Sequence, residues 1–159
     1  MRFADVLEKM GADIIWGPDS ITVKGVKGGG RLQGIDVDCG EIPDAAMTLA
    51  AVTLVCDGQM VIRNVGSWRV KETERMKAIV CECRKLGCDV VEGEDFCKIR
   101  APKEINDNVL IDTYDDHRMA MTFALVACAG KTVRIRDPGC TKKTFPQYFE
   151  FLERIAEFS

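Results

Sequence analysis

An internal repeat of roughly 75 residues is the feature that most constrains the fold of this chain. The segments Asp44-Ala-Ala-Met-Thr48 and Arg118-Met-Ala-Met-Thr122 each open an apolar run, and Lys9-Met-Gly-Ala-Asp13 aligns with Lys85-Leu-Gly-Cys-Asp89. A unit of this size cannot bury its apolar face alone, so neighbouring copies must pack against each other. We therefore expect copies of one unit around a shared core.

One complete unit is predicted over 32–101, and its order is βαβαββ. Hydrophobic periodicity and turn residues divide it into strand 32–37, helix 43–56, strand 59–65, helix 71–86 and a closing hairpin of 88–92 with 96–100. A partial unit over 109–159 has helix 116–129, strand 131–136 and helix 145–157, and stops before its hairpin. Residues 1–31 supply only the last helix and hairpin of an earlier unit. We expect one domain over 1–159 that is part of something larger.

The predicted helices are of two kinds. Residues 45–55 and 119–129 are apolar almost all round, which predicts buried central helices. Helix 71–86 carries a single apolar stripe that includes Met76 and Cys83, as an outer helix does. The predicted fold class is α/β, with sheets and outer helices packed around buried central helices.

Composition excludes several classes of protein. The 22 Lys and Arg balance 25 Asp and Glu to a net charge of −3, so no basic field for nucleic acid exists. The longest apolar runs fall short of the roughly 20 residues that a membrane span needs. The amino terminus carries charges through its apolar positions, unlike a signal peptide. We expect a soluble, cytoplasmic protein without nucleic-acid or membrane partners.

The eight cysteines do not have the spacing of a metal site. No Cys-x-x-Cys pair occurs, and the one histidine, His117, is far in sequence from the only cluster, Cys81, Cys83 and Cys88. Cys56 and Cys128 lie at the ends of apolar runs. We interpret the thiols as small, reduced core residues and expect no metal and no cofactor, with zinc as the alternative.

The equivalent helix starts differ in charge. A helix start presents unpaired N–H groups and a positive dipole end, so Asp44 after Pro43 is favourable there and Arg118 is not. A bound anion would explain Arg118. The alternative is an ordinary helix cap at Asp44 and a capping cluster of Asp115 and Asp116 with solvated charges around Arg118.

Further charges stand near the start of helix 71–86. Lys71 and Arg75 form a like-charge i,i+4 pair that an anion between them would stabilise. Helical spacing points Glu72 into the apolar stripe, where burial would raise its pKa and cations would lower it, as in a carboxylate acting as an acid. An i,i+3 ion pair between Glu72 and Arg75 is the alternative. Lys143 precedes the last helix and is either a surface lysine or part of the same site.

Four motifs together resemble the 5-enolpyruvylshikimate-3-phosphate synthase family. They are Ile42-Pro-Asp-Ala-Ala-Met-Thr48, Trp68-Arg-Val-Lys-Glu-Thr-Glu-Arg75, Tyr114-Asp-Asp-His-Arg-Met-Ala-Met121 and Asp137-Pro-Gly-Cys-Thr-Lys-Lys-Thr-Phe-Pro146. The resemblance covers nearly the whole chain, as the carboxy-terminal part of a two-domain enolpyruvyl transferase. It implies that each domain has three βαβαββ units around buried helices.

The resemblance also implies a reaction and its residues. The family joins phosphoenolpyruvate to the 5-hydroxyl of shikimate 3-phosphate and releases phosphate, in chorismate and aromatic amino acid biosynthesis. By resemblance, Asp44 is the base at the shikimate hydroxyl and Glu72 exchanges the proton at the methylene carbon. The resemblance assigns phosphoenolpyruvate to Arg75, Arg118 and Lys143, the shikimate 3-phosphate site to Lys71 and Ser67, and support of Arg118 to His117.

Some parts of the family pattern are missing or altered. Ser67 stands where many family members have asparagine, so its role is the weakest match. The amino-terminal domain, which supplies a lysine-serine pair and arginines for the phosphates, is not in this sequence. We therefore expect this chain to fold but not to turn over by itself. The alternatives are a fragment of the related UDP-N-acetylglucosamine enolpyruvyl transferase and a non-catalytic anion-binding remnant.

Overall fold

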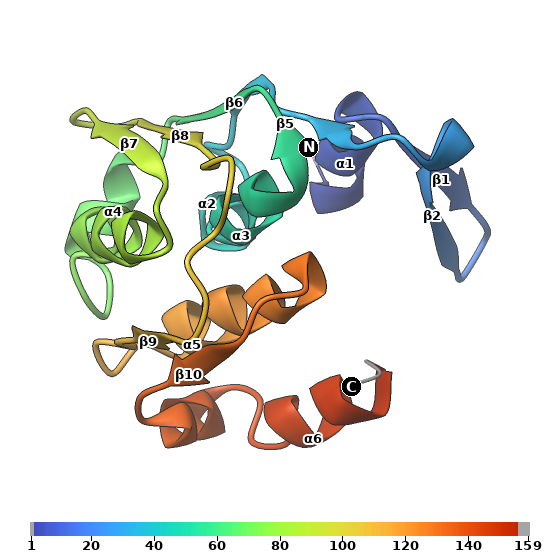
Figure 1. Ribbon diagram of the computed structural model, residues 1–159. Coiled ribbons are helices and arrows are strands. Elements are labelled where there is room, and N and C mark those ends of the chain that lie inside the picture. Colours follow the sequence, from blue (N-terminus) through green and yellow to red (C-terminus); the bar gives the residue numbers. More distant parts are fainter. Residues whose placement is uncertain (1, 156–159) are drawn as a thin grey trace.

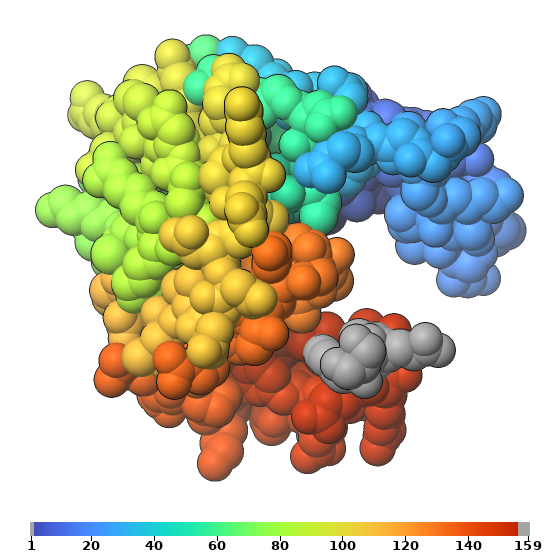
Figure 2. Space-filling model, in the orientation of Figure 1, coloured from blue at the N-terminus to red at the C-terminus, as the bar shows by residue number. Residues whose placement is uncertain are grey.

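The structure, a computed structural model, describes residues 2–155, and its first part is a helix with a hairpin. Helix α1 (Phe3–Lys9) leads into antiparallel strands β1 (Ala12–Trp16) and β2 (Ile21–Val26), followed by a short 3-10 turn, η1 (Lys27–Gly29). The hairpin extends sideways from the rest of the molecule (Figures 1 and 2). The helix and hairpin predicted within residues 1–31 are therefore present.

The complete unit forms a four-stranded sheet in the order β4-β6-β8-β7. Strands β4 (Asp36–Asp38) and β6 (Gln59–Arg63) are parallel, as the βαβ connection through the central helical run requires, and the hairpin β7 (Asp89–Glu92) and β8 (Cys97–Arg100) adds antiparallel to β6. The other elements of the unit are β3 (Leu32–Gln33), α2 (Pro43–Ala46), α3 (Thr48–Val52), η2 (Thr53–Val55), β5 (Cys56–Asp57), η3 (Gly66–Val70) and α4 (Arg75–Lys85).

The last unit repeats the parallel pair and the central helix. Strands β9 (Val109–Ile111) and β10 (Val133–Ile135) pair in parallel. In the sequence they are separated by α5 (His117–Ala124) and η4 (Leu125–Ala129). The 3-10 segment η5 (Pro138–Lys143) and helix α6 (Tyr148–Ile155) follow. The end of the predicted helix 145–157 lies outside the described residues.

The two central helical runs form the middle of the molecule. Leu49 and Ala50 of α3 and Met119 and Phe123 of α5 are fully buried. Figure 1 shows α3 and α5 next to each other, with the four-stranded sheet above them and β10 and α6 below. The predicted α/β class, with buried central helices inside sheets and outer helices, is confirmed.

The run predicted as helix 43–56 is helical but irregular. Met47, between α2 and α3, keeps helical torsion angles (φ −56°, ψ −36°), and the N–H of Ala50 donates to its carbonyl at 3.0 Å. Such i→i+3 bonds tighten a helix locally without changing its direction. The run therefore still carries Asp44 at its amino end and buries its apolar side chains.

The prediction of a helix over 71–86 was wrong at its start. Helix α4 begins at Arg75, because the carboxylate of Glu74 accepts a hydrogen bond from the N–H of Lys77 at 2.6 Å and caps the first turn. Lys71 is extended (φ −98°, ψ −159°). Lys71 and Glu72 therefore belong to the segment before the helix, and Glu72 does not point into the apolar stripe.

All eight cysteines are free thiols, and five are buried core residues, namely Cys39, Cys56, Cys83, Cys88 and Cys97. Cys128 is exposed, although its place at the end of an apolar run favoured a core position. Within residues 2–155 no helix is long and apolar enough to cross a membrane. In the same residues no group of His, Cys, Asp and Glu could hold a metal ion.

Candidate functional site

The amino ends of the two central helical runs meet at a cluster of ion pairs. Asp44 lies in the first turn of α2, and Asp116 is the N-cap residue of α5. The start of α4 and the end of η5 bring further charges to them. The cluster consists of Asp44, Lys71, Glu72, Arg75, Asp116, Arg118 and Lys143.

Arg75 is the centre of this cluster, with only 1% of its side chain exposed. Its Nε lies 2.7 Å from Asp116 Oδ2, its Nη1 2.9 Å from Asp44 Oδ1, and its Nη2 2.8 Å from Glu72 Oε2. Burial opposes the charge, but the hydrogen bond and charge of Asp116 and the charges of Glu72 and Asp44 raise the pKa of Arg75. The guanidinium therefore joins three segments that are far apart in sequence.

Asp44 accepts contacts from cations on three sides. Besides Arg75, Lys71 Nζ lies 3.6 Å from Asp44 Oδ1, and Arg118 Nη2 lies 3.4 Å from Asp44 Oδ2. The anion expected between Lys71 and Arg75 is therefore the Asp44 carboxylate in this structure. The side chain is 39% exposed, so water and solutes can reach it.

Glu72 bridges Arg75 and Lys143. Its Oε1 lies 3.1 Å from Lys143 Nζ, and the expected i,i+3 pair with Arg75 is also formed. A hydrogen bond from its own backbone N–H, the bond from Lys143 and the charge of Arg75 lower the pKa of Glu72 to about 2, although partial burial opposes this. Glu72 is therefore ionised at neutral pH in this arrangement.

The two remaining predicted site residues, His117 and Ser67, lie outside the ion-pair cluster. The side chain of His117 is 4% exposed and its Nδ1 lies 3.7 Å from Asp116 Oδ1, with no hydrogen-bond partner for Nδ1 within residues 2–155. Burial lowers the pKa of His117 more than the Asp116 charge raises it, so the ring is neutral at pH 7. Ser67 is exposed on η3 and forms no hydrogen bond with the cluster among the described residues.

Two buried carboxylates in this region were not predicted as site residues. Asp116 Oδ1 accepts the N–H of Arg118 at 2.8 Å, which is the cap that its position indicates, but its pairing with Arg75 has no signal in the local sequence. Glu82 of α4 is fully buried and accepts the hydroxyl of Tyr114 at 2.7 Å. Its spacing from Arg75, about two helical turns on one face, is the signal that could have indicated it.

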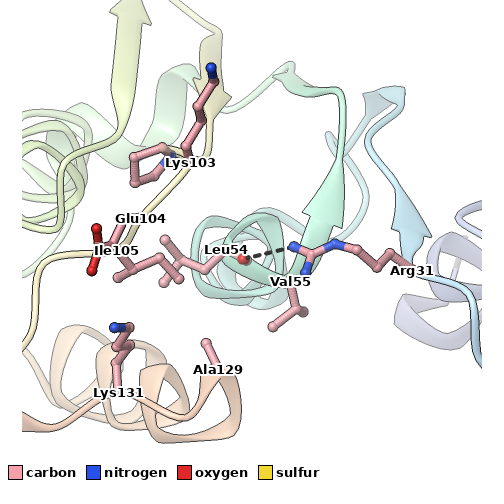
Figure 3. A pocket seen from close by; sticks show the side chains of 9 residues that line it. Arg31, Leu54, Val55, Lys103, Glu104, Ile105, Ala129 and Lys131 are labelled. Carbon is pink, nitrogen blue, oxygen red and sulfur yellow. Dashed lines mark hydrogen bonds between the residues drawn. The ribbon is translucent and has the colours of Figure 1, made fainter.

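A separate pocket lies at the opposite ends of the central helical runs. It has a volume of about 230 Å³, and Leu54, Val55 and Ala129 line it at the carboxyl ends of η2 and η4 (Figure 3). Arg31 donates to the Leu54 carbonyl there at 3.4 Å, as cations commonly do at the free carbonyls of helix ends. The pocket and the ion-pair cluster are therefore distinct features.

Comparison with known proteins identifies the family. The model of the family EPSP synthase (3-phosphoshikimate 1-carboxyvinyltransferase) matches residues 1–152. The chain belongs to the EPSP synthase family. The resemblance of its four motifs to this family is thereby confirmed, and every member of the ion-pair cluster lies within the matched residues.

Relatives in the EPSP synthase family are similar over nearly all of this chain. It is 55% identical over 161 residues to 3-phosphoshikimate 1-carboxyvinyltransferase 1, chloroplastic, of Nicotiana tabacum, covering 99% of this chain and 31% of the relative. It is 53% identical to the 3-phosphoshikimate 1-carboxyvinyltransferase of Paraburkholderia phytofirmans, covering 98% and 36%. The chain therefore spans about a third of the length of these relatives.

Solved structures share the fold. EPSP synthase from Acinetobacter baumannii superposes with a TM-score of 0.82 at 22% identity, over 95% of this chain and 38% of that one. The enolpyruvyl transferase NikO from Streptomyces tendae gives a TM-score of 0.74 at 18% identity, over 95% and 34%. The arrangement of helices and sheets is thus that of enolpyruvyl transferases.

Proposed function

We propose that this chain is part of a transferase that moves the carboxyvinyl group of phosphoenolpyruvate to the 5-hydroxyl of shikimate 3-phosphate and releases phosphate. This is a step of the shikimate pathway. Membership of the EPSP synthase family supports the reaction, and the observation that carries it is the ion-pair cluster at the amino ends of the central helices. Acids, bases and cations for this chemistry gather there.

The edge of Arg75 that carries Nη1 and Nη2 suits a substrate carboxylate. Arg75 Nε bonds buried Asp116 at 2.7 Å, and Nη2 also reaches Asp116 at 3.3 Å. The closer contacts of Nη1 and Nη2 are to Asp44 and Glu72, which are 39% and 29% exposed. Arg118 is 34% exposed and contacts Asp44 at a longer distance, 3.4 Å. We assign the phosphoenolpyruvate carboxylate to Arg75 and Arg118, since a planar guanidinium matches a carboxylate in geometry.

Asp44 and Glu72 have the two proton-transfer roles in this proposal. Asp44 takes the proton of the 5-hydroxyl as the new C–O bond forms, and Glu72 gives a proton to the methylene carbon. Glu72 then takes a proton back from the resulting methyl group as phosphate leaves. Because its own backbone N–H, the bond from Lys143 and the charge of Arg75 lower the pKa of Glu72 to about 2, it must first gain a proton. A phosphate bound at Lys143 would offset that cation and raise the pKa of Glu72.

The other cations take the phosphates. The side chain of Lys143 is 58% exposed, and we assign it to the phosphate that leaves. Lys71 and Ser67 are assigned to shikimate 3-phosphate, and buried His117 supports the start of α5 beside Arg118. We expect no further cofactor.

We further propose that the missing amino-terminal domain of the enzyme is the partner of this chain. Residues 1–159 would form part of its carboxy-terminal domain, with units over 1–31, 32–101 and 109–159, in the cytoplasm. Coverage of about a third of the relatives supports this partner. Binding both substrates across a cleft between domains supplies much of the rate, so the chain alone does not turn over.

A hybrid enzyme tests the proposed function. The missing portion would come from the Paraburkholderia phytofirmans relative, joined at the aligned start of this chain. We expect phosphate release from phosphoenolpyruvate with shikimate 3-phosphate and none with UDP-N-acetylglucosamine. The chain alone is the negative control. A hybrid that folds but is inactive with shikimate 3-phosphate, or prefers the sugar nucleotide, contradicts the proposal.

A further inference from the structure

We propose that Glu82 and Tyr114 are positioning residues that hold the segment 112–116 against α4, so that Asp116 reaches Arg75. The effect on substrate binding rests on the proposed function, whereas the positioning itself does not. Neither residue belongs to the ion-pair cluster, and neither has a role in the reaction proposed above.

The first observation is the complete burial of the Glu82 carboxylate. Its Oε1 accepts the Tyr114 hydroxyl at 2.7 Å, and its Oε2 accepts the N–H of Asp112 at 3.2 Å and pairs with Lys85 Nζ at 2.8 Å. A buried carboxylate is tolerated only when its lone pairs are satisfied in this way. Two of its three partners come from the segment 112–116, so Glu82 ties this segment to α4.

The second observation is the spacing of two anchors on α4. Arg75 and Glu82 lie about two turns apart, which places them on one face of the helix. Arg75 holds Asp116 through Nε at 2.7 Å, and Glu82 holds Tyr114 and Asp112. The segment therefore runs along α4 between a cationic anchor and an anionic anchor.

The third observation is the backbone between these anchors. Tyr114 and Asp115 both have φ of 55°, in the left-handed region that side-chain-bearing residues rarely adopt. Such a conformation persists only when its surroundings impose it. Tyr114 is 40% exposed, and its hydroxyl is held by the bond to Glu82 at 2.7 Å.

The consequence reaches both guanidinium groups. Asp116 binds Nε and Nη2 of Arg75 and also accepts the N–H of Arg118 at the start of α5. If Tyr114 is released, residues 114–115 can relax to ordinary torsion angles and Asp116 moves away from Arg75. The edge of Arg75 assigned to the substrate carboxylate then loses its fixed orientation.

The test compares two tyrosines that each donate one hydroxyl hydrogen bond. Tyr114→Phe removes the bond to Glu82, and the matched control Tyr148→Phe removes a bond of 2.9 Å to the Met121 carbonyl on another part of the chain. The measurement is the exchange rate of the Arg75 Nε–H proton in ¹⁵N NMR of the full chain, assigned by its loss in Arg75→Lys. We expect exchange at least about tenfold faster in Tyr114→Phe and unchanged in Tyr148→Phe.

Unchanged Arg75 exchange in folded Tyr114→Phe overturns the inference, and so does an equal increase in both tyrosine variants. If Tyr114→Phe does not fold, Glu82→Met decides, because methionine keeps a similar volume but removes both oxygens that accept from Tyr114 and Asp112. Slow exchange retained in folded Glu82→Met is then the overturning result. The exchange measurements need no substrate. Their outcome is therefore independent of the outcome of the hybrid assay, which tests the proposed function. In an active hybrid, Tyr114→Phe should raise KM for phosphoenolpyruvate severalfold more than KM for shikimate 3-phosphate.

Discussion

Asp44 and Arg118 occupy the same position in two copies of the repeat, and they contact each other, with Arg118 Nη2 3.4 Å from Asp44 Oδ2. Arg118 stands where a helix start disfavours a cation, and the opposite charge on the neighbouring copy compensates for this. The paired helix starts thus bring a carboxylate and a guanidinium together.

Asp44→Asn tests the role of this carboxylate as a base. The amide keeps the size of the side chain and one acceptor oxygen, but it is uncharged and cannot take up the hydroxyl proton. In the hybrid enzyme we expect kcat to fall at least about 100-fold. Phosphate release under saturating substrates is the measurement, and near-wild-type kcat would rule out Asp44 as the base.

Glu72 should make stability depend on pH in acid. Its folded pKa of about 2 lies below its ordinary value of 4.5, so the unfolded chain takes up the proton first as pH falls. Its contribution is complete above about pH 4.5 and is lost by about pH 2, and at a side chain 29% exposed it amounts to on the order of 1 kcal/mol.

Urea unfolding between pH 5 and pH 2 measures this contribution. In Glu72→Gln the free energy of unfolding should fall less between pH 5 and pH 2 than it does in the parent chain. Glu104→Gln, which changes an exposed glutamate outside the cluster, is the control and should leave the curve unchanged. Equal curves for Glu72→Gln and the parent chain would show that Glu72 is not stabilised as a carboxylate.

The buried pair of Arg75 and Asp116 should be costly to break on one side. These side chains are 1% and 0% exposed, so Asp116→Asn leaves a buried cation without its closest counter-charge. We expect a loss of about 3 kcal/mol in the free energy of unfolding. The double variant Arg75→Met/Asp116→Asn should lose less free energy of unfolding than the sum of the losses in the two single variants. Strict additivity in urea unfolding would mean that the two groups do not act as a pair.

The cysteines should separate by reactivity. Cys81 and Cys128 are exposed, whereas burial raises the pKa of Cys39 and Cys56 to about 11 and that of Cys97 to about 12. Thiolate is the reactive form, so brief alkylation at pH 8 should label the exposed pair first. Mass spectrometry of peptides gives the labelled positions, and labelling in urea should reach all eight. Fast modification of Cys97 in the native chain would contradict this packing.

The repeat predicted that Asp44 and Arg118 stand at equivalent helix starts. The sequence also predicted the central helices, because residues that are apolar all round can only be buried. The start of α4 was missed, because periodicity continues through Lys71 and Glu72 and does not reveal that Glu74 caps the helix. The predicted orientation of Glu72 into the apolar stripe was therefore wrong. Its ion pair with Arg75, which the sequence analysis gave as the alternative, is present.

The roles of Asp116 and Glu82 were beyond reach for a different reason. Each forms its decisive contact with a residue that is distant in sequence, Arg75 and Tyr114 respectively. Such pairings follow from how α4 lies against the segment before α5. The spacing of Glu82 from Arg75 places both residues on one face of α4, but it does not specify which segment that face meets. The sequence also does not reveal the left-handed torsion angles at Tyr114 and Asp115, because glycine, the residue that usually marks such angles, is at neither position.

The hairpin of β1 and β2 has the same register as that of β7 and β8, with Ile14 opposite Val23 as Val90 is opposite Ile99. Ile99 is fully covered, but Val23 is 53% exposed, and among residues 2–155 only β1 pairs with β2. An uncovered apolar edge is a template for pairing with other chains. Purified alone, this polypeptide should therefore self-associate with rising concentration, and a charged residue at Val23 should improve its solubility.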